Sequence, residues 1–512
     1  TMSVNIAGYQ KLLVPVLLFA LVAQRHFEHP LSASTTTVQP LHKTLTTQNS
    51  NDNAQHKSET INYDLSVAGL GKRRSYSTHY CLGPREIEAT QSTIVRMYRS
   101  CHYTDVCFAP SGHPLYKKSS LEFHPFSMLY ITKDGDNSDY VQEPELLKSI
   151  IKAQGLIRGP SRMVPKRKFY MTPRMINQST ADLHEKYWSP IPVTVPFVPH
   201  QCTNFGHAIG DNAFAVFRIL QNFGLYHPEL DFLPMRIDCA EEDKCLDSCS
   251  CLDRCKALYK VMSPFLKGGA KIPDFNHYYN TALNITTADY LQRREKQSLP
   301  LLCFENVLSG MYYYADHGED QSMHGGKEDE NGSNLFLVGK GDKLREFRSH
   351  YMIRLGLDPN HHLQSPCASR DSASILILPR RPENSRGSGW YEDKLIAELQ
   401  KILPDEKVIV PDYEKYNIKA QIELASTVKI LVSMGGGASY LAWFLAPGAS
   451  ALLLKRNCRV NDGFIWDNLS YVRKEYFNAT DCKSVPEVFD YAEMAKSVEG
   501  LIQHYNRRFC EE

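Results

Sequence analysis

Short apolar runs alternate with amphipathic segments through the second half of the chain. The apolar runs predict strands, and the segments with apolar residues three and four positions apart predict helices. In chain order, the expected elements are a strand at 374–378, a helix at 390–403, a strand at 407–410, a helix at 416–425, a strand at 428–432, a helical turn or two at 439–445, a strand at 450–454 and a helical tail from about 485 to 508. This alternation is typical of parallel βαβ units and predicts a doubly wound domain of the nucleotide-binding type.

The pattern is less regular in the front half, from about Tyr80 onward. Strands are expected near 128–132 and 193–198, and a helix from about Gly206 to Phe223. Residues 239–260 and 316–333 are expected to be loops, and the second of these is acidic and Gly-rich, as a surface insertion would be. No internal repeat of fixed period is visible.

The N-terminal 75 residues follow neither pattern. Lys11 precedes a twelve-residue apolar run, 12–23, which is shorter than the roughly 20 residues of a full membrane span. It fits either a cleaved signal peptide that ends near Ala23 or an uncleaved anchor. Residues 32–60 are rich in Ser, Thr, Asn and Gln and predict a flexible tether. Anchor, stem and large domain in this order are the layout of a type II Golgi or endoplasmic reticulum enzyme; the alternative is a secreted protein with a disordered start.

Composition narrows the possible partners. The chain has 512 residues, enough for roughly two to four domains. Its 58 Lys+Arg and 57 Asp+Glu residues leave a net charge of +1, without the basic excess that a nucleic-acid-binding protein usually shows, so no nucleic acid partner is expected. A mean hydropathy of −0.37 excludes a polytopic membrane protein.

The cysteines agree with a lumenal location. There are 14, and five of them fall between Cys239 and Cys255. None of the steps in this cluster is the C-x2-C pair of a typical zinc site, so the cluster favours disulfides that staple a loop. Five N-x-[ST] sequons, at Asn177, Asn284, Asn331, Asn468 and Asn478, support the same compartment.

The first candidate for chemistry is a His/Asp pair at the start of the expected front helix, in Asn204-Phe-Gly-His207-Ala-Ile-Gly-Asp211. His207 and Asp211 are four residues apart and therefore neighbours on a helix, where a carboxylate can orient an imidazole for acid–base catalysis. Arg218 lies on the same stripe, and the alternative is an ordinary solvated helix face. The other face carries residues expected to pack on a core: Ile209, Ala213, Val216, Phe217 and Leu220.

Two further candidates follow expected strands of the second half. Arg380 and Arg386 come after the strand at 374–378, in a position where guanidinium groups can pair with phosphate oxygens. Gly435, Gly436 and Gly437 come after the strand at 428–432 and open a helical segment that contains Ser439. The free main-chain N–H groups at the start of this segment would suit a phosphate. The alternatives are a charged loop and a tight strand–helix turn.

Taken together, these motifs resemble glycosyltransferase family 61. Several segments are similar to that family's blocks and occur in its order. They are Arg99-Ser-Cys101…Cys107-Phe, Asn204-x-x-His207-x-x-x-Asp211, Cys303-Phe304 with Gly310, the Arg380/Arg386 pair, and Ser433-Met-Gly435-Gly436-Gly437 with Phe444-Leu445 and Pro447-Gly448-Ala449. The sequence departs from the family where Gly435 replaces a usual His, where Ala446 replaces a usual Pro, and near Lys455, where no Glu follows the strand.

The resemblance implies a GT-B fold, in which two Rossmann-like α/β domains face a cleft. It also implies an inverting glycosyltransferase that binds no metal and needs no cofactor besides its UDP-sugar donor. UDP-GlcNAc or UDP-xylose would be the donor, and a hydroxyl of a glycoprotein or glycan the acceptor. The expected organisation is a signal anchor or signal peptide at 1–24, a stem at 25–75, an acceptor-side domain at 76–345, a nucleotide-sugar domain at 346–485 and a helical tail at 486–512.

The residues then take complementary roles. His207 or Asp211 would deprotonate the acceptor, with Asn204 as a positioning residue. Arg380, Arg386, Gly435–Gly437 and Ser439 would hold the donor pyrophosphate. Two alternatives stay open: a non-catalytic lumenal glycan-binding protein of the same fold, which the missing His at Gly435 favours, and a metal-dependent GT-A transferase that uses Asp134-Gly-Asp136. That acidic pair is also a good turn sequence.

Overall fold

Two β-sheets and the helices around them make up the described part of the protein. The computed structural model describes residues 73–82, 100–117, 125–135, 149–150, 170–199, 205–227, 230–237, 256–266, 272–310, 342–360, 375–379, 391–412, 415–434, 437–455, 469, 471–478 and 489–510. All of these belong to one compact unit, Tyr63–Glu512. The expected signal or anchor segment 1–24 and the stem through residue 72 lie outside them. No helix in the described ranges is long and apolar enough to cross a membrane.

The sheet of the second half is wholly parallel. Its strands are β11 (Ile375–Ile377), β12 (Val408–Ile409), β13 (Ile430–Met434), β14 (Ser450–Lys455) and β15 (Arg473–Asn478). They are arranged in the order β12-β11-β13-β14-β15, and every neighbouring pair is parallel. The doubly wound arrangement that the apolar pattern predicted is confirmed. The order of the strands reverses between β11 and β13, and ligands of doubly wound folds bind at such a switch point.

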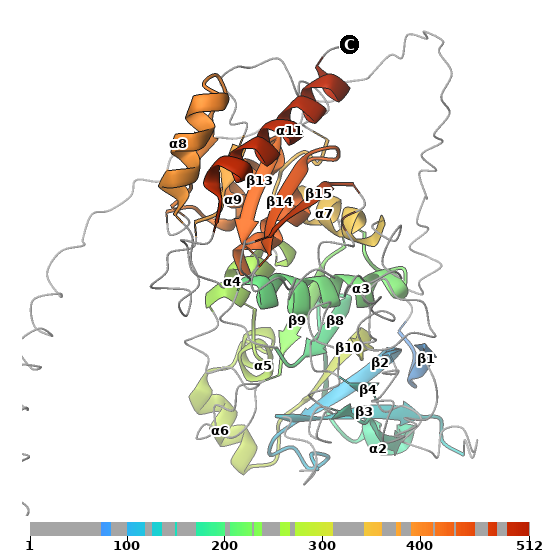
Figure 1. Ribbon diagram of the computed structural model, residues 1–512. Helices are drawn as coiled ribbons and strands as arrows, with labels where there is room; N and C mark the ends of the chain where they lie inside the picture. The colour runs from blue at the N-terminus through green and yellow to red at the C-terminus, as the bar shows by residue number, and fades with distance from the viewer. Residues whose placement is uncertain are drawn as a thin grey trace, which may run out of the picture. The chain divides into compact units, whose positions relative to one another are not determined.

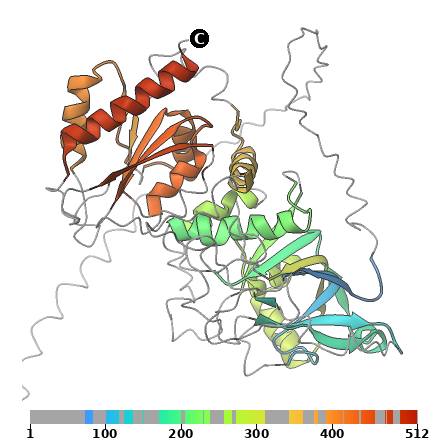
Figure 2. The same cartoon turned by 45° about the vertical axis from the view of Figure 1, so that its right-hand side comes forward.

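Helices cover both faces of this parallel sheet. They are α8 (Glu392–Ile402), α9 (Ile418–Thr427), the 3₁₀ helix η10 (Gly437–Phe444) and α11 (Tyr491–Phe509). α8 and α11 lie side by side on one face (Figures 1 and 2), where Leu395 and Leu399 pack with Ile430 and Val432. The alternate residues of the strands, such as Leu431, pack with α9 and η10 on the other face. This two-sided burial is why the strands read as continuous apolar runs.

The sheet of the front half is mixed. Its strands are β1 (Thr78–Leu82), β2 (Ser100–Pro110), β3 (Phe126–Thr132), β6 (Arg174–Asn177), β7 (Lys186–Trp188), β8 (Val193–Phe197), β9 (Phe232–Arg236) and β10 (Leu301–Ser309). The order is β6-β3-β2-β10-β8-β9, with β1 beside β2 and β7 beside β10. β2 is antiparallel to β1, β3 and β10, whereas β8 is parallel to β9 and β10. A separate two-stranded sheet pairs β4 (Ser149–Ile150) with β5 (Tyr170–Met171).

This mixed sheet differs from the doubly wound front domain that the family resemblance implied. Antiparallel neighbours can be joined without a helix, whereas parallel neighbours need a crossover connection. A crossover of that kind links β8 to β9 through the π-helix η4 (His207–Ala213) and α3 (Phe214–Asn222). β10, β8 and β9 therefore form a parallel group in the front sheet, where β3–β6 and β7–β10 are parallel pairs as well.

The remaining helices of the front half precede and follow β10. They are α2 (Gln178–Asp182), α4 (Lys256–Met262), the 3₁₀ helix η6 (Ser263–Phe265), α5 (Phe275–Ala282), α6 (Thr287–Glu295) and α7 (Asp342–Arg354). The expected loop at 239–260 is wrong for its last residues, because α4 begins at Lys256; the earlier part, with the cysteine cluster, lies outside the described residues. The expected domain boundary after residue 345 falls inside α7.

One apolar core connects elements of both sheets. It contains Val193, Val195 and Phe197 of β8, the buried side chains of η4 and α3, and those of α7, α9 and η10. Strand residues such as Leu431 of β13 belong to the same cluster. The helix that carries the candidate His/Asp pair is therefore packed between the front sheet and the helices of the second half.

Two disulfides tie the front sheet across directly paired residues. Cys81 of β1 bonds Cys101 of β2, and Cys107 of β2 bonds Cys303 of β10. Cys510, at the end of α11, is also disulfide-bonded. The described part of the chain contains no free cysteine.

Candidate functional site

The helix that carries His207 begins with a π-helical turn. Its backbone closes on i→i+5 hydrogen bonds, as Phe214 N–H does on Ile209 O, instead of the i→i+4 bonds that the sequence spacing assumed. The buried Asn212 side chain donates from Nδ2 to His207 O at 2.7 Å and spans the same turn. His207 and Asp211 therefore lie within one wide turn. The side chain of Asp211 lies outside the described residues.

The surroundings of this helix are more enclosed than the sequence predicted. The expected buried face is confirmed, since Ile209, Ala213, Val216, Phe217 and Leu220 are all fully buried. Ala208, Phe214 and Ile219 are buried as well, so apolar contacts extend beyond one stripe. His207 is half-buried.

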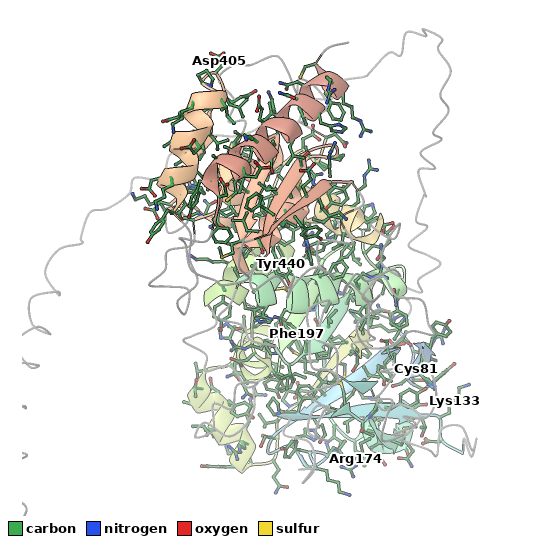
Figure 3. All side chains as sticks on the ribbon, in the orientation of Figure 1. Cys81, Lys133, Arg174, Phe197, Asp405 and Tyr440 are labelled. Atoms are coloured by element: carbon green, nitrogen blue, oxygen red, sulfur yellow. A yellow bond between two sulfur atoms is a disulfide. The ribbon has the colours of Figure 1, made fainter. Side chains whose placement is uncertain are left out.

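The helix contacts the segment that follows the three glycines. Gly206 and Gly210 both face the ring of Tyr440 in η10, which is labelled in Figure 3. A Cβ atom placed on Gly206 would lie 2.7 Å from Tyr440 Cε2 and 2.9 Å from Gly437 Cα, and one on Gly210 would lie 2.7 Å from Tyr440 Cε1. The candidate acid–base motif and the candidate phosphate loop, more than 200 residues apart in sequence, thus meet in direct contact.

The two candidate donor segments leave neighbouring strands. Leu378, just after β11, donates its N–H to Val432 O of β13 at 2.9 Å. The segment with Arg380 and Arg386 continues from β11, and the glycines continue from β13, so both begin at the switch point of the parallel sheet. Arg380, Arg386, Gly435, Gly436 and Asn204 themselves lie outside the described residues. Gly437 opens η10, and Ser439 is buried there.

Asp134, the first residue of the alternative acidic pair, lies in an exposed turn after β3. Gly135 has a φ of +80°, in the left-handed region that favours glycine, and Asp134 Oδ1 accepts the N–H of Ser179 in the first turn of α2 at 3.1 Å. Asp136 lies outside the described residues. Within the described ranges, no group of three or more His, Cys, Asp or Glu side chains is arranged to hold a metal ion.

Sequence reasoning missed the residue that joins the two motifs. Tyr440 was expected only as part of an apolar helical segment. The available signal was the spacing of Gly206 and Gly210, four residues apart on one helix face, since paired small residues permit a close approach by another element. Nothing in the sequence identifies which aromatic side chain fills that face.

The comparison with known families covers this region. Residues 205–452 match the family model described as Glycosyltransferase 61. This stretch begins one residue before Gly206, runs through η4, β11, β13 and η10, and ends within β14. No curated protein matches the chain. The two motifs that meet at Tyr440 both lie inside the matched region, so the chain carries a glycosyltransferase family 61 domain over these residues and is a glycosyltransferase.

Proposed function

We propose that this glycosyltransferase moves a sugar from a UDP-sugar, UDP-GlcNAc or UDP-xylose, to a hydroxyl group of a glycoprotein or glycan with inversion at the anomeric carbon. The observation that carries the proposal is the contact of Gly206 and Gly210 with Tyr440 and Gly437. This contact brings a helix with a His/Asp pair beside Gly437, the last of three glycines that follow a strand at the sheet switch point. A sugar transferase needs this combination of a base for the acceptor and a cradle for a departing diphosphate.

The donor would be held from the side of the parallel sheet. Arg380 and Arg386 would pair with pyrophosphate oxygens, and Gly435–Gly437 with Ser439 would offer main-chain N–H groups at the start of η10. Gly435 takes the place of the usual family His, so the backbone and the arginines would carry that interaction here. Fixed positive groups of this kind stabilise the charge that develops on leaving UDP.

The acceptor would be activated from the η4 side. His207 or Asp211 takes the proton of the acceptor hydroxyl, and the oxygen attacks the anomeric carbon as its bond to the β-phosphate oxygen breaks. UDP leaves with the electron pair of that bond. Attack from the face opposite UDP inverts the configuration.

A donor screen tests this proposal. The purified full-length chain is incubated with each UDP-sugar, with and without EDTA, and both UDP release and the product anomer are measured. We expect turnover of one donor, no loss of rate in EDTA, and a product of inverted configuration. Loss of all turnover in EDTA would instead favour the acidic pair Asp134/Asp136 and a metal-dependent reaction.

The donor contacts have a separate test. Arg380→Ala and Arg386→Ala each remove a charged hydrogen-bond donor worth about 1.5–3 kcal/mol, so UDP affinity in calorimetry should fall roughly tenfold or more. Arg345→Ala, an exposed arginine of α7, is the matched control and should bind UDP as the wild type does. Wild-type affinity in both loop variants, with intact folding, would remove these arginines from the donor site.

We propose further that the enzyme works in the Golgi or endoplasmic reticulum lumen, held in the membrane as a single-pass type II protein by residues 12–23. The paired Cys81–Cys101 and Cys107–Cys303 support an oxidising compartment. Carbonate extraction followed by protease protection tests the location. Release of a soluble protein whose N-terminus lies near Gln24 would contradict the anchor and favour a cleaved signal peptide.

A further inference from the structure

We propose that Tyr440 is a positioning residue, whose ring acts as a fixed spacer between the η4 helix and the donor loop. The inference rests on the proposed function, because it concerns how the candidate base is held relative to the candidate donor cradle. It adds three residues, Tyr440, Gly206 and Gly210, to the residues expected from the sequence.

The contact itself shows why the ring sets a distance. Gly206 and Gly210 present a helix face without side chains, and the Tyr440 ring lies across both of them. Gly206 has a φ of −61°, and neither glycine has a positive φ, so the backbone conformation does not require glycine at these positions. What requires glycine is space. A Cβ at either position would come within 2.7 Å of a ring carbon, closer than real Cβ contacts.

The ring cannot move aside easily. Tyr440 is only 3% exposed, and its ring also packs against Trp443, with ring centroids 4.9 Å apart. Trp443 is fully buried and packs edge-to-face on Phe214 of α3 and Phe347 of α7. The spacer is therefore supported from behind by a close-packed aromatic cluster, in which displacing one ring displaces the others.

The position of this spacer in the chain links it to both halves of the proposed reaction. His207 directly follows Gly206, and Asp211 directly follows Gly210. On the other side, Tyr440 lies three residues after Gly437, whose Cα is itself 2.9 Å from the Cβ position of Gly206. A side chain added at Gly206 or Gly210 would push the backbone of the His/Asp helix away from the donor loop. Misplacement by about 1 Å can cost roughly 100-fold in rate.

Gly210→Ala is the first test, because the three atoms nearest to its Cβ position all belong to the Tyr440 side chain. We expect kcat to fall about 10- to 100-fold while UDP affinity changes less than about twofold. Gly206→Ala should lower kcat and also weaken UDP binding, since its Cβ meets the Gly437 backbone as well. Gly500→Ala in α11 is the matched control: nothing lies within 4 Å of its Cβ position, so activity should be unchanged.

The Tyr440 series tests the spacer from the other side and does not depend on the glycine variants folding. Tyr440→Phe keeps the ring and should keep kcat within about twofold of the wild type. Tyr440→Leu removes the ring and should lower kcat at least tenfold per folded molecule. In Gly210→Ala/Tyr440→Leu the added methyl group occupies part of the vacated space, so the loss should be smaller than the product of the two single losses.

Each outcome decides between positioning and a merely structural role. Wild-type kcat per folded molecule in Gly210→Ala and Tyr440→Leu, even with lowered melting temperatures, would overturn the inference. Multiplicative losses in the double variant would overturn the direct contact as their cause. If the wild-type enzyme turns over no UDP-sugar while folding normally, the proposed donor class fails instead, and this result is separate from any change among the variants.

Discussion

At the scale of single residues, His207 has the clearest role to test. It is half-buried and follows a glycine that contacts the donor side, and its main-chain oxygen is held by Asn212. Removing a general base typically costs about 10²- to 10⁴-fold in rate. His207→Ala and Asp211→Asn should lower turnover by this order while UDP affinity is retained, and the two losses should not add if the residues act as one unit.

The control for this experiment is His277→Ala, an exposed histidine of α5, which should leave turnover unchanged. Because η4 is enclosed, melting curves of every variant belong to the measurement. Early melting together with loss of UDP binding would make the pair structural. Wild-type turnover in both variants would place the base elsewhere in the front half.

A second residue-scale prediction concerns pH. His113 is 3% exposed, accepts the N–H of Leu115 at Nδ1, and lies 4.7 Å from the ring of His184. Burial, with a smaller contribution from His184, lowers the pKa of His113 to about 4 from its usual 6.5. The unfolded chain therefore binds more protons between about pH 4 and 6.5, so this histidine destabilises the fold progressively as pH falls through that range.

His113→Gln should remove most of this dependence, flattening the plot of unfolding free energy against pH by roughly 1–3 kcal/mol across the range. His184→Gln is the partner control and should give a smaller change. Asp105 changes stability with pH in the opposite direction, because burial raises its pKa to about 6 and its contribution favours the fold at low pH. The slope of His113→Gln is therefore compared with that of the wild type, which contains the same Asp105. An unchanged pH slope in His113→Gln would contradict the assignment.

At the scale of elements, the sequence was most informative where strands are buried on both faces. The apolar runs at 374–378 and 450–454 fall on β11 and β14, and the helix periodicity at 390–403 falls on α8. The strand expected at 428–432 begins and ends two residues too early, since β13 begins at Ile430 and ends at Met434. Val428 instead follows the last residue of α9 as its C-cap, and an apolar residue at a helix end looks the same as one in a strand.

The front half was less predictable for physical reasons. β2 carries a residue with positive φ, Asp105, inside the strand, which interrupts the simple alternation of buried and exposed positions. The π-helical turn of η4 cannot be distinguished from an α-helix by apolar spacing over seven residues. The motif residues His207 and Gly437 could be selected from sequence, but their contact through Tyr440 depends on tertiary packing.

One element-scale prediction concerns Arg348 of α7, which is almost fully buried. Its Nε donates to Phe444 O, at the end of η10, and its Nη1 donates to Pro359 O at 3.0 Å. Arg348→Ala would leave both carbonyls without this partner and open a cavity, so it should lower the free energy of unfolding by about 3 kcal/mol or more. Arg348→Lys should keep only part of the stability that Arg348→Ala loses, because one ammonium group cannot reproduce the forked geometry of the guanidinium.

Denaturant unfolding measures both variants. Arg345→Ala, exposed on the same helix, is the control and should change stability by less than about 0.5 kcal/mol. Equal stability of Arg348→Ala and the control would show that the C-terminal end of η10 does not need this arginine.

At the scale of the whole molecule, the shared core and the disulfides act on different parts of the fold. The core that includes β8, α3, α7 and η10 couples elements of both sheets, whereas the paired Cys81–Cys101 and Cys107–Cys303 lie within the front sheet. The proposed site depends on the shared core, because the contact between Tyr440 and Gly206 lies where the core joins the two halves.

The two disulfides should differ in their effect on stability. Cys107–Cys303 closes a loop of 196 residues and Cys81–Cys101 one of 20, and the chain-entropy relation gives the longer loop about 2 kcal/mol more stabilisation. Cys107 and Cys303 are also fully buried in the middle of the sheet, so Cys107→Ala/Cys303→Ala leaves a cavity as well. Denaturant unfolding under oxidising conditions should show a larger loss for this pair than for Cys81→Ala/Cys101→Ala. Equal losses, or a larger loss for the edge pair, would mean that strain or residual structure in the unfolded chain outweighs loop closure.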